Sequence, residues 1–61
     1  MTRELEGRIT DGIQVRLLWN PGDDRVSVAV NDTRTGDAFE LPVRDGDGAF
    51  DVFRHPYAYA A

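Results

Sequence analysis

The sequence predicts an α+β fold: a small three-stranded antiparallel β-meander with a short C-terminal helix packed on its apolar face. Three observations predict this fold. Three segments alternate between apolar and polar residues, turn motifs connect them, and an aromatic segment with helical spacing follows. The chain has 61 residues, so we expect a single domain over residues 1–61 with a small core.

The predicted strands cover residues 12–20, 25–32 and 37–43. A period of two places every second side chain on the same face of a sheet, and the types at these positions are mostly β-branched or aromatic, as strands prefer. The apolar positions are Ile13, Val15, Leu17, Trp19, Val26, Val28, Val30, Phe39, Leu41 and Val43. Together they form one apolar face that another element must cover.

The connections between these strands have the composition of turns. In Asn20-Pro21-Gly22-Asp23, proline at the second position and glycine at the third predict a type II turn. In Thr33-Arg34-Thr35-Gly36, the pattern predicts a type I turn followed by a glycine with positive φ. Two antiparallel hairpins are therefore expected.

Closing the second hairpin at this turn fixes a register in which apolar residues meet apolar residues. In the first hairpin, the same alternation pairs the odd-numbered apolar residues of the first strand with the even-numbered apolar residues of the second. Pro42 lacks an N–H group, which predicts that the third strand lies at an edge of the sheet. The expected pairs are Val30 with Phe39, Val28 with Leu41 and Val26 with Val43.

A short helix is predicted over residues 48–55. Phe50 and Phe53 are three positions apart, so they share one helix face, and Asp47 suits the N-cap. Pro56 is expected to end this helix. We expect its aromatic face to cover the apolar side of the sheet.

The two ends of the chain remain open at this stage. Leu5 and Ile9 are spaced for one face of a helix, but Gly7 weakens a helix, and the alternative is that residues 1–11 are frayed. Residues 57–61 are expected to form a C-terminal tail. Its tyrosines complete the core or form an interface, and in a dimer they can do both.

Composition excludes several classes of function. There is no cysteine, which excludes disulfides and thiolate metal sites. The net charge of −4 disfavours nucleic acid and anionic membranes as partners. No apolar run reaches the roughly 18 residues of a membrane span, and no signal-peptide core is present. We therefore expect a cytoplasmic protein that does not bind membranes.

No catalytic, metal or cofactor site is expected. The segment Asp45–Asp51 resembles a calcium loop, but it lacks the EF-hand residues at the later positions. His55 has no cysteine or suitably placed serine to activate. Asp51, four residues before His55, forms only an ordinary helix-surface pair with it. The chain is therefore not expected to be an enzyme.

The candidate partner-binding residues are Arg54, His55, Tyr57 and Tyr59. Tyrosine and arginine dominate the binding energy of many protein interfaces. The sequence therefore predicts a non-catalytic protein-interaction or accessory module that binds another protein or itself, with homodimer and monomer both open. The alternative is a nucleic-acid-associated regulator that uses the polar face of the sheet, where Gln14 and Arg16 are expected.

The Trp19-Asn20 hairpin, followed by Phe53-Arg54-His55-Pro56-Tyr57-Ala58-Tyr59-Ala60, resembles short uncharacterised proteins of high-GC Gram-positive bacteria. The resemblance covers about two thirds of the chain. It implies no activity, cofactor or site residue.

Overall fold

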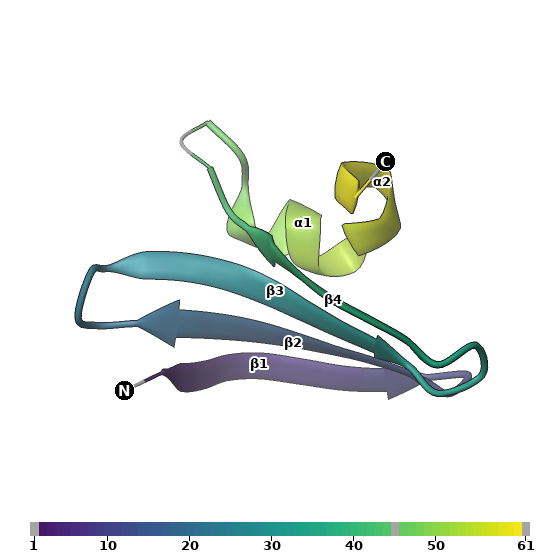
Figure 1. The fold of residues 1–61 in the computed structure, drawn as a ribbon. Helices are drawn as coiled ribbons and strands as arrows, with labels where there is room; N and C mark the ends of the chain where they lie inside the picture. The colour runs from purple at the N-terminus through teal and green to yellow at the C-terminus, as the bar shows by residue number, and fades with distance from the viewer. Residues whose placement is uncertain (1, 45, 61) are drawn as a thin grey trace.

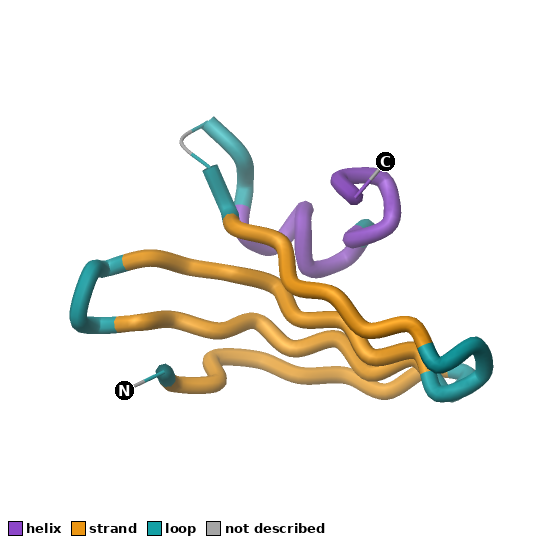
Figure 2. The backbone as a smooth tube through the Cα atoms, viewed as in Figure 1, coloured by secondary structure: helices purple, strands orange, loops and turns teal. Residues whose placement is uncertain are grey.

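A computed structural model of the chain describes residues 2–44 and 46–60. Its four strands form one antiparallel sheet in the order β1-β2-β3-β4, and its two helices lie over one face of that sheet (Figures 1 and 2). Among the described residues, no helix is long and apolar enough to cross a membrane. The elements are β1 (Arg3–Thr10), β2 (Ile13–Asn20), β3 (Arg25–Asp32), β4 (Asp37–Pro42), α1 (Ala49–Arg54) and α2 (Pro56–Ala60).

The antiparallel meander is confirmed, but it has four strands where the sequence predicted three. The additional strand is β1, which pairs with β2, so residues 3–10 are neither helical nor frayed. A two-residue turn, Asp11-Gly12, joins the two strands, with φ angles of 52° and 80°. These angles fit the type I′ hairpin turn, for which Asp-Gly is a preferred sequence.

The irregular pattern of β1 explains why it was missed. The pairing of β1 with β2 shifts by one residue between Glu4 and Glu6, as in a β-bulge. Leu5, which lies between them, is therefore out of phase with the alternation of Gly7 and Ile9 further along. The Asp11-Gly12 dipeptide was the signal that could have identified the hairpin.

The predicted register is confirmed. Pro42 also lies at an edge, because β4 is the outermost strand on its side of the sheet. The main-chain N–H of Val43 donates to the Val26 carbonyl at 2.9 Å just beyond the end of β4. The paired residues are Val28 with Leu41 and Val30 with Phe39 between β3 and β4, and Val15 with Val30 and Leu17 with Val28 between β2 and β3.

One of the two predicted turns has a different conformation. Gly36 has the expected positive φ of 81°, and its N–H donates to the Asp32 carbonyl at 2.8 Å. The type II prediction for the first turn is wrong, because the positive φ falls on Asp24, at 56°, and not on Gly22. The Trp19 indole N–H donates to the Asp24 carboxylate at 2.9 Å, which holds Asp24 in this conformation.

The core lies between the sheet and α1. The strands contribute Val15, Leu17, Val28 and Val30, and α1 contributes Val52 and Phe53. The prediction that Phe50 covers the sheet is wrong, since Phe50 is 58% exposed whereas Val52 is 1% exposed. Ala49, Val52 and Phe53 form an i, i+3, i+4 stripe, and Phe50 lies outside it.

The ends of the helices also differ from expectation. The N-cap of α1 is Gly48, without a side-chain cap, and Asp47 instead accepts a hydrogen bond from the main-chain N–H of Arg44 at 3.3 Å. The end of α1 before Pro56 is as predicted. Pro56 then begins α2, because proline fits the first position of a helix.

The two phenylalanines of α1 provide a test of this packing. We expect Phe53→Ala to lower the free energy of unfolding by about 3–5 kcal/mol, because its buried ring would leave a cavity. The matched variant Phe50→Ala should lower it by less than about 1 kcal/mol. Urea denaturation followed by Trp19 fluorescence measures both. Equal losses would contradict the placement of α1.

Candidate functional site

A groove of about 360 Å³ lies between the β1–β2 hairpin and the junction of the two helices. Three of the four predicted partner-binding residues line it, namely Arg54, His55 and Tyr57. Tyr59 does not line it, and its hydroxyl donates to the Asp51 carboxylate. The remaining charged residues that line this region, called the cationic groove below, are Arg8, Asp11 and Arg34.

Arg8 connects β1 to α1 at this groove. One guanidinium nitrogen, Nη2, donates to the main-chain carbonyls of Phe53 and Arg54, each at 3.1 Å. The guanidinium carbon also lies 5.4 Å from the centroid of the Phe53 ring. The last carbonyls of a helix lack partners within the helix, so Arg8 satisfies the end of α1 and is itself fixed in place. Arg8 is not among the predicted site residues, because the strand β1 that places it beside α1 was not predicted.

A buried carboxylate fixes the other side of the groove. Asp32, which is 4% exposed, accepts hydrogen bonds from Arg34 through the main-chain N–H at 3.0 Å and through Nε at 3.3 Å. The Tyr57 hydroxyl also donates to it, at 3.2 Å. The hydrogen bond from the Arg34 side chain lowers the pKa of Asp32 despite its burial. The same pairing raises the pKa of Arg34.

Tyr57 belongs both to the packing and to the groove. Its ring packs edge-on against Phe39, with centroids 5.5 Å apart and an interplanar angle of 68°. Burial, followed by the hydrogen bond to Asp32, raises the pKa of its hydroxyl. It nevertheless remains 46% exposed. Residues 57–60 of the tail therefore lie in helix α2. One side of the Tyr57 ring covers the end of the sheet, and the other side is exposed to solvent.

The charges of the groove differ from those of the whole chain. Three arginines, Arg8, Arg34 and Arg54, lie around it together with two aspartates, Asp11 and Asp32. This leaves a positive region on a chain with a net charge of −4. Apolar side chains, Ile13 and Val15 among them, contribute to the floor. Such a site can hold a carboxylate beside an apolar group.

His55 and the described residues 46–51 of the calcium-like segment do not come together with further metal-ligand side chains. Within residues 2–44 and 46–60, no group of three or more ligand-type side chains comes together. The expected side-chain pair of Asp51 with His55 is replaced by a main-chain bond, in which the His55 N–H donates to the Asp51 carbonyl at 3.0 Å. Asp45, the first residue of the calcium-like segment, lies outside the described residues.

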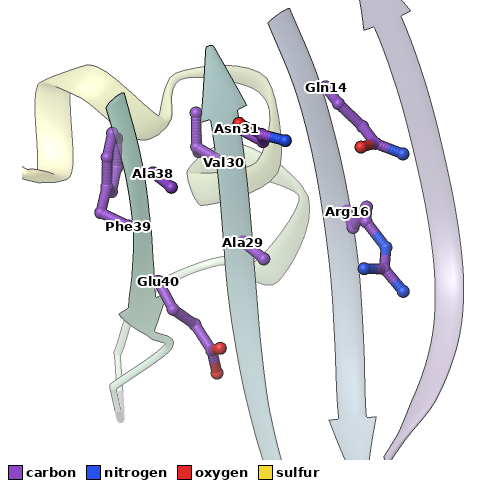
Figure 3. A pocket seen from close by; sticks show the side chains of 8 residues that line it. All are labelled: Gln14, Arg16, Ala29, Val30, Asn31, Ala38, Phe39 and Glu40. Carbon is purple, nitrogen blue, oxygen red and sulfur yellow. The ribbon is translucent and has the colours of Figure 1, made fainter. Parts of the chain in front are cut away.

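The opposite face of the sheet carries a second, shallow depression of about 450 Å³. Its polar rim comes from Gln14, Arg16, Asn31 and Glu40, around the small residues of β3 and β4 (Figure 3). The Arg16 guanidinium is 2.6 Å from the Glu4 carboxylate. This is the face that the nucleic-acid alternative would use.

Comparison with protein-family models, curated proteins and solved structures finds no match to this chain.

The role of Arg8 can be tested by removing its side chain. We expect Arg8→Ala to lower the free energy of unfolding by about 1–2 kcal/mol, because two helix carbonyls lose a charged donor. Arg3→Ala is the matched control on the same strand, since Arg3 is exposed, and it should have a smaller effect. Thermal denaturation followed by circular dichroism measures both. A larger loss for Arg3→Ala would contradict this role.

The lowered pKa of Asp32 implies that the free energy of unfolding depends on pH. Its pKa in the folded protein lies below the ordinary value of 3.8, so its stabilising contribution is complete above that value and is lost as the pH falls through the folded pKa. We therefore expect Asp32→Asn to destabilise at neutral pH, and the difference from the wild type to shrink in acid. Urea midpoints over a pH series measure this. Asp37→Asn, an exposed aspartate, is the control. A constant difference at every pH would contradict the prediction.

Proposed function

We propose that this chain is a non-catalytic protein-interaction module whose cationic groove binds a segment of another protein. The segment would carry a carboxylate next to an apolar side chain. The observation that supports this most is the convergence of Arg8, Arg34 and Arg54 on an apolar-floored groove in an acidic chain. These arginines come from three separate parts of the fold.

Two of the three arginines are held in place without a ligand. Nη2 of Arg8 bonds to two main-chain carbonyls, and Arg34 bonds to the buried Asp32. A ligand that meets fixed donors loses less side-chain freedom on binding. The groove therefore presents preorganised N–H donors from Arg8 and Arg34, and the charge of Arg34 is balanced by Asp32.

Arg54 is the residue best placed to anchor a carboxylate. It is exposed in the last turn of α1, and no hydrogen bond or ion pair involves its side chain among the described residues. A guanidinium binds a carboxylate through two parallel hydrogen bonds. Beside it, the half-exposed Tyr57 offers an aromatic surface of the kind that dominates interface energetics.

The nucleic-acid alternative has weaker support. The open face of the sheet presents Arg16, whose charge is paired with Glu4, and it also presents the exposed Glu40. Binding to phosphates requires several unpaired basic side chains. The cationic groove is therefore the better-supported interaction site.

The proposal can be tested with a displayed library of random peptides selected on the wild-type protein. We expect the enriched peptides to carry an acidic residue or a free C-terminal carboxylate next to an apolar residue. Arg54→Gln should weaken their binding by about tenfold, because a charge-assisted hydrogen bond is lost. Arg25→Gln, a matched change at the start of β3 next to the β2–β3 turn, should leave the Kd unchanged.

Two results would overturn the proposal. One is the absence of any enriched peptide. The other is enrichment of peptides whose affinity does not change with Arg54→Gln or when their carboxylates are replaced by amides.

A further inference from the structure

The outer edge of β1 is a second open surface. β1 pairs with β2 on one side only, and no other described element lies along its outer side (Figure 1). Every residue of this eight-residue strand is exposed except Arg8, which is half-buried. Leu5 and Ile9 are 53% and 74% exposed. A long exposed edge with apolar side chains is a template for pairing with another strand.

The main chain of Gly7 faces outward at the centre of this edge. Its N–H is directed at the carboxylate of the preceding Glu6, with an N···O distance of 3.4 Å, and so it does not pair with β2. In an antiparallel pair, successive residues alternate between facing the partner strand and facing away from it. Ile9, two residues further on, therefore also directs its main-chain groups outward.

We infer that β1 pairs antiparallel with β1 of a second copy of this chain, with Gly7 on the two-fold axis. In this register Glu6 lies opposite Arg8 of the second copy, and both residues lie on the regular side of the bulge at Leu5. By symmetry this pair occurs twice. Two ion pairs then flank the axis, and cross-strand pairs of opposite charge stabilise a sheet.

The charge pattern selects this register over its neighbours. A shift that places Glu6 on the axis puts this glutamate opposite its own copy. The opposite shift puts Arg8 opposite its own copy. Like charges directly opposite each other destabilise a sheet, so Gly7, which carries no side chain, is the favourable residue for the axis.

The other edge of the sheet is less suited to this pairing. β4 contains Pro42, which has no N–H to donate and is typical of edges that do not pair.

Nη2 of Arg8 is engaged with α1, but a guanidinium has five N–H donors, which leaves some for Glu6 of the second copy. The inference goes beyond the proposed function and does not depend on a ligand in the groove.

The first test measures the oligomeric state by sedimentation equilibrium over a concentration series. We expect a reversible dimer of the wild-type chain. Glu6→Lys should raise its Kd by about tenfold or more, because two ion pairs become like-charge pairs. Glu40→Lys, the same charge change on the exposed part of β4, should leave the Kd unchanged. A monomer at every concentration, or a dimer that is insensitive to Glu6→Lys, would overturn the inference.

The second test locates the axis by disulfide cross-linking. The chain has no cysteine of its own, so any cross-link must form between the introduced cysteines. Opposed residues in a hydrogen-bonded antiparallel pair have Cα atoms about 5.5 Å apart, which a disulfide spans. Gly7→Cys should therefore cross-link under mild oxidation. A Cβ at Gly7 meets only ordinary contacts, the nearest 3.5 Å away on Glu4. Thr35→Cys, in an exposed turn, and Glu40→Cys should not cross-link. Cross-linking of Glu40→Cys without Gly7→Cys would place the interface at β4 and overturn the inference.

Discussion

The packing of α1 on the valine-rich face of the sheet is the contact on which the rest of this structure depends. A sheet with one apolar face is not stable in water until that face is covered. In this small chain the cover consists mainly of Val52 and Phe53, whose side chains are 1% and 6% exposed. They pack with Val28 and its neighbours in one cluster. Arg8 adds a polar connection at the end of the same helix, so the helix is held both by burial and by hydrogen bonds.

The groove is a consequence of where this helix ends. Because α1 is short and Pro56 starts a new helix, the chain turns directly above the β1–β2 hairpin. The turn places Arg54 and His55 beside residues that are more than forty positions earlier in the sequence. Tyr57 then reaches Asp32 at the end of β3. The packing of the core thus determines which charged side chains meet at the surface.

The comparison of sequence and structure shows which features are local. The pairing of Val28 with Leu41 was predictable because a period of two and a recognisable turn both specify it. β1 was missed because the bulge near Leu5 interrupts the alternation. The i, i+3 spacing of Phe50 and Phe53 suggested a shared buried face, whereas the buried stripe runs through Ala49, Val52 and Phe53 and leaves Phe50 exposed. The groove residues on the helix side, Arg54, His55 and Tyr57, are neighbours in the sequence and could be predicted together. Arg8 and the residues on the opposite side meet them only in the tertiary fold.

Arg8 links the two proposed surfaces. Its guanidinium lines the cationic groove on the covered side of the sheet, and in the proposed dimer it also lies opposite Glu6 of the second copy. A carboxylate in the groove and this glutamate would compete for the N–H donors of the Arg8 guanidinium. Ligand binding and dimerisation are thermodynamically linked, so each changes the affinity of the other by the same factor. A ligand that weakens the dimer must therefore bind the dimer less tightly than it binds the monomer. Both proposals are thus tied to the position of one side chain, which the end of α1 fixes.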